Sequence, residues 1–130
     1  MARNTRTFTD LDFNFLLHPK TADVSTRSDE EAIKQSVRNL VMTRNFERPF
    51  RSEVGCQATA LLFEPISPMT GTLIEKSISD VINNYEPRVV LLDVTAKFSP
   101  ENNSVYATIT FKIKNTETPV SVNLILERTR

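Results

Sequence analysis

Cysteine, histidine and glycine are all scarce in this chain of 130 residues, which has one cysteine, one histidine and two glycines. A single cysteine excludes an intramolecular disulfide and is typical of a chain that folds in a reducing compartment. We therefore expect Cys56 to be a small buried apolar residue rather than a reactive thiol.

The lone histidine and the two glycines exclude several kinds of catalytic site. With only His18, the chain can form neither a histidine-rich zinc site nor an HExxH helix, and a Ser-His-Asp triad would need this one residue. Gly55 and Gly71 are too few for the glycine-rich phosphate loops of nucleotide-binding proteins. We expect no metal ion, no cofactor and no catalytic residue.

Net charge and long apolar runs are missing as well. Sixteen Lys plus Arg offset sixteen Asp plus Glu, so no global positive field attracts phosphate backbones, and nucleic acid is not an expected partner. No run approaches the roughly 18 apolar residues of a membrane span, and the polar start lacks the apolar core of a signal peptide. We expect neither a membrane partner nor export by that route.

The composition that remains is that of a folded domain, with 39% hydrophobic and 25% charged residues. Residues 1–27 are polar and irregular, and we interpret them as an N-terminal arm with an apolar cluster that docks on the rest of the chain. The cluster consists of Phe13, Phe15, Leu16 and Leu17. Residues 28–130 form one further domain.

Two long amphipathic helices are predicted in this domain. The first covers residues 28–43, where Ser28 and Glu31 form a capping box ahead of apolar residues at helical spacing. The second covers residues 68–85, with Ser67 as its N-cap and a proline at the first helical position. Each helix carries one apolar stripe that needs a partner surface.

After Pro87 the apolar period changes from 3.6 residues to 2, which predicts three strands. These strands cover residues 88–98, 104–114 and 120–128. In the first strand we expect Val90, Leu92 and Val94 to face the core. Short connections favour an antiparallel meander. The predicted fold class is α+β, with amphipathic helices packed on one face of a three-stranded antiparallel C-terminal sheet.

A proline between opposite charges, Glu86-Pro87-Arg88, lies where the second helix gives way to the first strand. Pro87 fixes its own φ at about −65° and pushes Glu86 towards an extended conformation. In an extended chain Glu86, Arg88 and Val90 share one side, which directs both charges at the margin of the core. Three interpretations stay open: a surface ion pair, a clamp inside the subunit, and a site that meets a second protein.

The last strand lacks the residues that usually protect a sheet edge. No internal proline or lysine discourages another strand from pairing with it, so the edge favours β-augmentation. The strand consists of Val120, Ser121, Val122, Asn123, Leu124, Ile125 and Leu126. The alternative is that the N-terminal arm covers this edge.

Three segments together resemble a known family: "RPFRSEVGC" at 48–56, "LLFEPISPMT" at 61–70 and "NNYEPRV" at 83–89. With the amphipathic helix and the three C-terminal strands, they are similar to the small wedge subunit of contractile-tail baseplates. That family includes the sheath initiator of T4-like phages and its counterpart in the type VI secretion baseplate. The resemblance runs from about Ser28 to Arg128.

The resemblance implies a non-enzymatic structural protein of the phage virion, assembled in the host cytoplasm in six copies around the tail tube. It implies that Glu86, Pro87 and Arg88 hold the subunit in the wedge, against a helical core bundle of larger wedge proteins. It also implies that the sheet is offered to the first ring of tail sheath protein, and the last strand supplies an edge for that contact.

The alternative function is a peptidoglycan-degrading, lysozyme-like enzyme, a label that members of this family have carried. A glycosidase needs two carboxylates about 5 to 10 Å apart, one with a raised pKa. The candidates, with Glu86 or Glu64 foremost, are Glu53, Glu64, Glu86 and Asp93. No spacing makes two of them converge, and Arg88 favours the ionised form of Glu86. A free-standing adaptor that binds through the same edge is a third possibility.

Overall fold

The computed structural model describes residues 8–114 and 116–128, except for the side chain of Ser28. Three helices are present in this part of the chain: α1 (Asp29–Met42), α2 (Ala58–Leu61) and α3 (Pro68–Tyr85). The strands are β1 (Thr9–Leu11), β2 (Thr26–Ser28), β3 (Val89–Ser99), β4 (Ser104–Ile113) and β5 (Pro119–Glu127). The predicted hydroxyl cap at Ser28 lies outside what is described.

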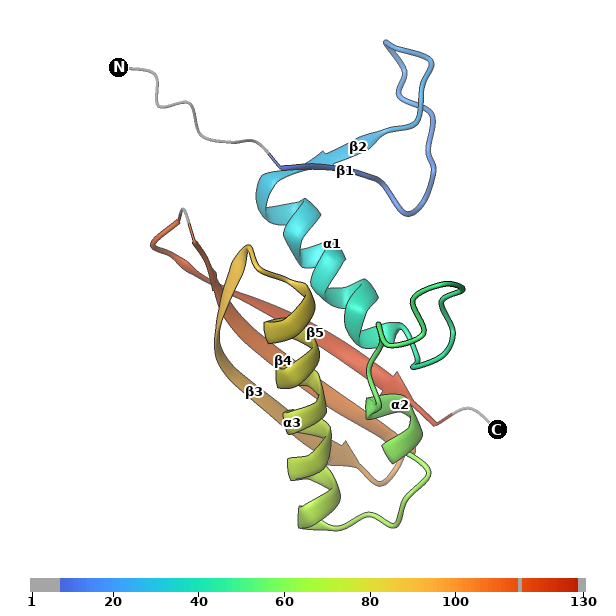
Figure 1. The fold of residues 1–130 in the computed structure, drawn as a ribbon, viewed down its shortest axis with the longest axis vertical. Helices are drawn as coiled ribbons and strands as arrows, with labels where there is room; N and C mark the ends of the chain where they lie inside the picture. Colours follow the sequence, from blue (N-terminus) through green and yellow to red (C-terminus); the bar gives the residue numbers. More distant parts are fainter. Residues whose placement is uncertain (1–7, 115, 129–130) are drawn as a thin grey trace.

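The three C-terminal strands form one antiparallel sheet in the order β3-β4-β5, and the two long helices pack on one of its faces (Figure 1). α3 lies along β3, whereas α1 lies nearer to β5. This arrangement confirms the predicted α+β fold class.

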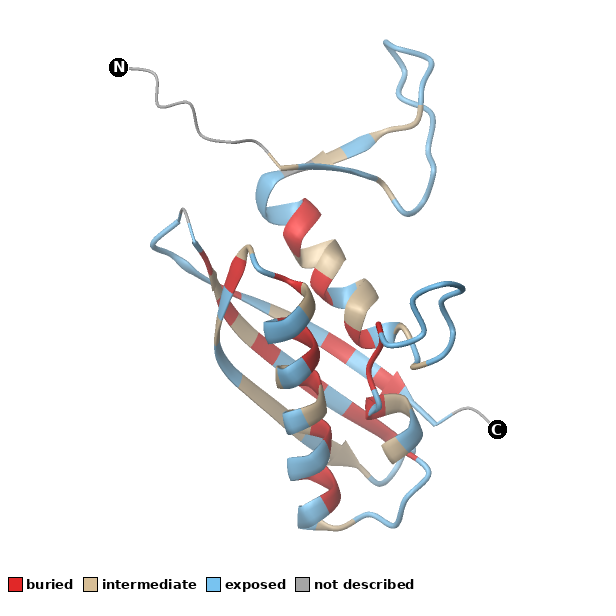
Figure 2. Ribbon diagram, in the orientation of Figure 1, coloured by how far each residue is buried: buried red, intermediate tan, exposed pale blue. Residues whose placement is uncertain are grey.

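The core lies between the helices and the sheet, where the apolar stripes meet the inward residues of the strands (Figure 2). Phe111 on the central strand is fully buried, as are Ile33 and Val37 on α1 and Ile74 and Ile78 on α3. Burying side chains of this size stabilises the fold by about 1.5 to 3 kcal/mol each. The apolar periodicity of the sequence therefore corresponds to the packing of the two long helices.

The boundaries of α3 are set by local chemistry at both ends. The Ser67 hydroxyl accepts a hydrogen bond from the backbone N–H of Thr70 at 3.2 Å, and Pro68 occupies the first turn. At the other end the Glu86 N–H donates to the carbonyl of Ile82 at 3.0 Å, and the helix stops before Pro87. Within the described residues, no helix is both long enough and apolar enough to cross a membrane.

A β-bulge in β3 overturns part of the predicted strand pattern. The register against β4 shifts between Leu91 and Asp93, so one extra residue enters the strand and the side-chain alternation changes phase. Val89 is 8% exposed, whereas Val90 and Leu92 are 48% and 55% exposed. The prediction that Val90 and Leu92 face the core is therefore wrong, while Val94 lies beyond the bulge and packs against the core.

The prediction that the N-terminal apolar cluster docks on the rest of the chain is also wrong. β1 pairs with β2 as a separate two-stranded sheet, and the connection between them projects away from the domain (Figure 1). The side chains of the cluster, which are 61% to 69% exposed, are Phe13, Phe15, Leu16 and Leu17. The hairpin is attached at its base, where the Asp29 N–H donates to the Phe8 carbonyl at 2.6 Å.

Candidate interaction surfaces

The corner between α3 and β3 is built around the Glu86 carboxylate. Glu86 is 3% exposed, and Arg88 binds it through two hydrogen bonds, Nε to Oε1 at 2.6 Å and Nη2 to Oε2 at 2.8 Å. The Ser36 hydroxyl on α1 donates to the same carboxylate at 2.5 Å. A buried charge without partners is costly in a low-dielectric interior. The hydrogen bonds from Arg88 and Ser36 compensate the charge of Glu86.

These contacts also set the protonation state of the corner. Burial alone would raise the pKa of the Glu86 carboxyl, but the hydrogen bonds from Arg88 and Ser36 outweigh it and hold that pKa below its ordinary value. The same hydrogen bond to Glu86 raises the pKa of Arg88. Glu86 is therefore an ionised hydrogen-bond acceptor, which opposes the general-acid role that a glycosidase requires.

Arg88 extends the corner to the base of the N-terminal hairpin. Its guanidinium carbon lies 5.3 Å from the centre of the Phe8 ring, within the range of a cation–π contact. Pro87 is exposed and occupies a turn, and β3 begins at Val89 rather than at the predicted residue 88. The burial of Glu86 excludes the interpretation as a surface ion pair. Ser36 and Phe8 also belong to this corner, and neither was identified from the sequence.

In the part of the chain that the structure describes, the outer side of β5 presents unpaired backbone groups. Just after β5, the Arg128 N–H donates to the carbonyl of Asn103, the residue before β4, at 3.3 Å. In an antiparallel ladder, the backbone groups of successive residues point alternately towards the partner strand and away from it. In β5 the N–H and C=O groups of Ser121, Asn123 and Ile125 therefore point away from β4. Within the described residues no strand pairs with this side of β5, because β1 and β2 pair with each other.

The outer side of β3 is partly closed by its own subunit. The Glu75 carboxylate on α3 accepts a hydrogen bond from the outward N–H of Ala96 at 2.8 Å. The bulge next to Leu92 disrupts the strand further along the same edge. Sequence analysis did not single out Glu75, because a contact across 21 residues leaves no local pattern.

The remaining candidate carboxylates lie on the surface, unlike Glu86. Glu53, Glu64 and Asp93 are all exposed. In residues 8–114 and 116–128, no group of three or more His, Cys, Asp or Glu side chains could hold a metal ion.

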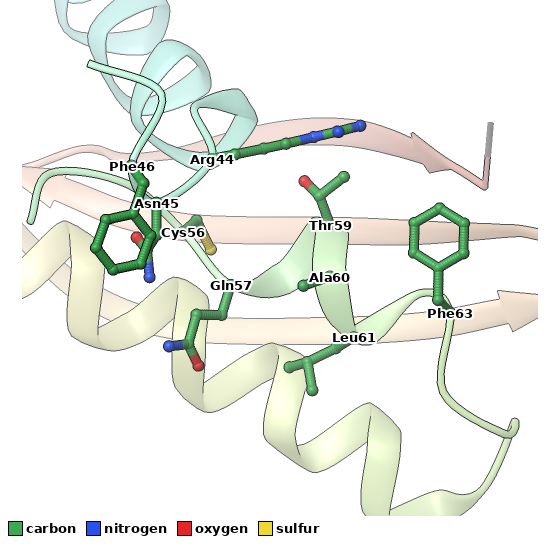
Figure 3. A pocket seen from close by; sticks show the side chains of 9 residues that line it. All are labelled: Arg44, Asn45, Phe46, Cys56, Gln57, Thr59, Ala60, Leu61 and Phe63. Atoms are coloured by element: carbon green, nitrogen blue, oxygen red, sulfur yellow. The ribbon is translucent and has the colours of Figure 1, made fainter. Parts of the chain in front are cut away.

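A shallow apolar hollow of about 480 Å³ lies beside Cys56 and α2 (Figure 3). Its walls include Phe46, Leu61 and Phe63 and contain no carboxylate. Cys56 is 1% exposed, and burial raises the pKa of its thiol. As expected from the sequence, Cys56 is a buried apolar residue.

The fold is that of subunits from contractile-tail baseplates. It superposes with a TM-score of 0.65 on a chain of the anti-feeding prophage baseplate, at 23% identity over 95% of this chain and 88% of that one. A Geobacter sulfurreducens protein, provisionally named a tail lysozyme, superposes with a TM-score of 0.69 at 30% identity, covering 78% of this chain and 92% of that one.

Sequence similarity identifies the family. Baseplate wedge protein gp25 of Enterobacteria phage T4 is 34% identical over 94 residues, which are 72% of this chain and 70% of that protein. Residues 27–118 match the family of baseplate wedge protein gp25, and the chain belongs to this family. The predicted resemblance is confirmed, and the chain is a baseplate wedge protein of a contractile tail. The matched range ends just before β5.

Proposed function

We propose that this wedge protein nucleates the tail sheath by accepting a strand from the first sheath ring along the outer side of β5. The observation that supports this choice of edge is the contrast between the two outer strands. Asn123 and its outward neighbours on β5 have no backbone partner in the described residues, whereas the Ala96 N–H on β3 is already bound by Glu75. Strand addition is a general way to recognise an extended segment through such an edge.

The energy of one such contact is modest. Each backbone hydrogen bond contributes about 0.5 to 1.5 kcal/mol net, so a five-residue strand gives a few kcal/mol before ordering costs. Six copies around the tail tube, as we propose, would present six such edges at once. Avidity then allows a weak edge to hold a whole sheath ring without holding isolated sheath subunits.

The Glu86 corner has a different role in this proposal. Glu86, Pro87 and Arg88 hold the subunit in the wedge against a helical core bundle of larger proteins, during assembly in the host cytoplasm. Because Glu86 is satisfied by Ser36 and Arg88, its contribution is to fix the shape of the corner. The exposed Pro87 and the outer part of Arg88 provide the contact surface.

We also propose that the protein acts without catalysis. The ionised, buried state of Glu86 supports this, because a general acid must still carry its proton near neutral pH in order to donate it. The assay is purified protein against peptidoglycan or a chitin oligomer. Turnover that is lost in Glu86→Gln or Glu64→Gln would restore the lysozyme alternative.

The test of sheath nucleation is a proline at the outward position of β5. Asn123→Pro removes an outward N–H and leaves the β4–β5 ladder intact, so we expect a folded protein that enters baseplates but supports no sheath. Circular dichroism measures the fold, and electron microscopy of assembled tails counts sheathed particles.

Two variants control for side-chain and edge effects. Asn123→Ala keeps the N–H and should support normal sheath growth. Val94→Pro removes an outward N–H from the other edge, since Val94 lies two residues from Ala96 on the same strand. Sheath growth that survives in Asn123→Pro but fails in a Val94→Pro variant that circular dichroism shows to be folded would assign nucleation to β3 instead.

A further inference from the structure

A groove of about 680 Å³ runs beside the beginning of β5, between that strand, α1 and the N-terminal hairpin. Ser121 and Val122 form its strand side, and Arg38 and Met42 belong to its helical side. Phe13 closes it from the hairpin. α1 and β5 run in the same general direction in this region (Figure 1). A strand added to the outer side of β5 would therefore pass along this groove.

Of the described cations that line the groove, Arg38 forms no ion pair. Arg27 lies 3.2 Å from Asp12, and Lys34 lies 2.7 Å from Glu30. Arg38 is exposed and forms no ion pair within the described part of the chain. An occupant with a carboxylate at this point would complement the groove.

The groove also contains exposed apolar side chains, one from the hairpin and one from α1. Phe13 is 67% exposed and Met42 is 49% exposed, and both line the groove. Met42 lies one helical turn beyond Arg38, which is a rise of about 6 Å. Alternate residues of a strand are separated by about 6.6 Å and point to the same face. One extended segment could therefore meet Arg38 and Met42 with side chains two positions apart.

We infer that this groove selects the strand that β5 accepts, and that the preferred segment carries an acidic and an aliphatic or aromatic residue separated by one residue. The acidic side chain meets Arg38, and the apolar one packs between Phe13 and Met42. This inference rests on strand addition at β5, which is the proposed function. It adds the side-chain chemistry that distinguishes one extended segment from another.

Multivalent display of random ten-residue peptides on phage, selected against the full chain, tests the inference. Multivalency offsets the weak affinity of a single strand. We expect enrichment of the acidic-x-apolar spacing, in either direction, and loss of those peptides with Asn123→Pro. In Arg38→Glu the enriched residue should become Lys or Arg, and the original peptides should bind about fivefold more weakly. Lys76→Glu, an exposed charge reversal outside the groove, should change neither the pattern nor the affinity.

The outcomes separate the two proposals. Peptides that need the Asn123 N–H but show no acidic preference and no response to Arg38→Glu overturn the groove selection and leave strand addition standing. Peptides that depend on Arg38 yet bind Asn123→Pro normally overturn strand addition at this edge. No enrichment above the Asn123→Pro background overturns the selection of a short segment by this groove.

Discussion

The two outer strands of the sheet differ in how firmly the rest of the subunit holds them. β3 follows the buried Glu86–Arg88 corner, lies along α3, and has one outward N–H bound by Glu75. β5 lies beside α1 with a groove between them and presents its outward backbone unpaired within the described residues. The comparison shows that a polar side chain from a helix can occupy a backbone group on one edge of a small sheet while the other edge stays available.

Substitutions in the Glu86–Arg88 corner, which precedes β3, should cause the largest loss in the free energy of unfolding. Arg88→Ala leaves a buried carboxylate with only Ser36 as a side-chain partner, and we expect it to lower the free energy of unfolding by about 3 kcal/mol. Urea denaturation measures this loss. We also expect the variant to be poorly incorporated into baseplates, which co-purification with the other wedge proteins would reveal.

A control for this variant is Arg27→Ala, which removes partly exposed ion pairs to Asp12 and Glu31 and should cost less than about 1 kcal/mol. Equal losses in the two variants would show that the buried corner holds β3 no more firmly than a surface pair does.

The bulge makes a sharp distinction between two adjacent leucines in β3. Leu91 packs against the core, whereas Leu92 is 55% exposed. Leu91→Ala should cost about 2 kcal/mol, and Leu92→Ala should stay within about 0.5 kcal/mol of the parent. Thermal and urea unfolding of the two variants measure the difference. A larger loss in Leu92→Ala would mean that the alternation predicted from the sequence, without a bulge, describes this strand.

Glu75 closes the edge of β3, and its removal should make the two edges more alike. Glu75→Ala frees the N–H of Ala96 and should cost about 1 to 2 kcal/mol. It should also allow weak self-association through the opened edge, which sedimentation velocity detects as a concentration-dependent shift. Lys76→Ala, at the next position on the same helix, is the matched control and should stay monomeric. Monomeric Glu75→Ala would show that the bulge alone closes this edge.

The smallest expected effect is the pH dependence of the free energy of unfolding. It tests the Glu86–Arg88 ion pair, which precedes β3 and has no counterpart described at β5. Because the pKa of Glu86 is lowered in the folded protein, its contribution to stability is present above the unfolded carboxyl pKa of about 4.3 and is lost as the pH falls through the folded value. The stability advantage of the parent over Arg88→Ala should therefore shrink as the pH falls below about 4.3 and through the lowered folded pKa. Unfolding curves at several pH values follow it, and an advantage that grows on acidification would contradict the ion pair.

The parts of the fold that follow from local patterns were predictable from the sequence. The helix expected at 68–85 is Pro68–Tyr85, because Ser67, Pro68 and the apolar spacing all act within one or two turns. The sheet followed in the same way from alternation and short connections. The bulge at Leu92 was missed because the sequence contains two overlapping apolar alternations. One runs through Val89 and Leu91, and the other runs through Val90 and Leu92.

The candidate site was predictable only in part. Glu86, Pro87 and Arg88 were identifiable because a proline between opposite charges is a local motif. Their partner Ser36 lies 50 residues away from Glu86, and the Glu75–Ala96 contact spans 21 residues, so neither leaves a sequence pattern. The N-terminal cluster was misplaced because apolar composition predicts burial, whereas the hairpin pairs with itself and presents those side chains outwards.

If the partial closure of β3 is enough to block strand addition there, strand pairing at β5 as proposed above gives the subunit a valence of one. A protein with two receptive edges can join its own copies into fibres, because each copy both accepts and offers a template. A monovalent copy ends such a chain instead of extending it. In the nucleation proposed above, Glu75 would direct growth one way, away from the baseplate, by occupying a single amide on β3.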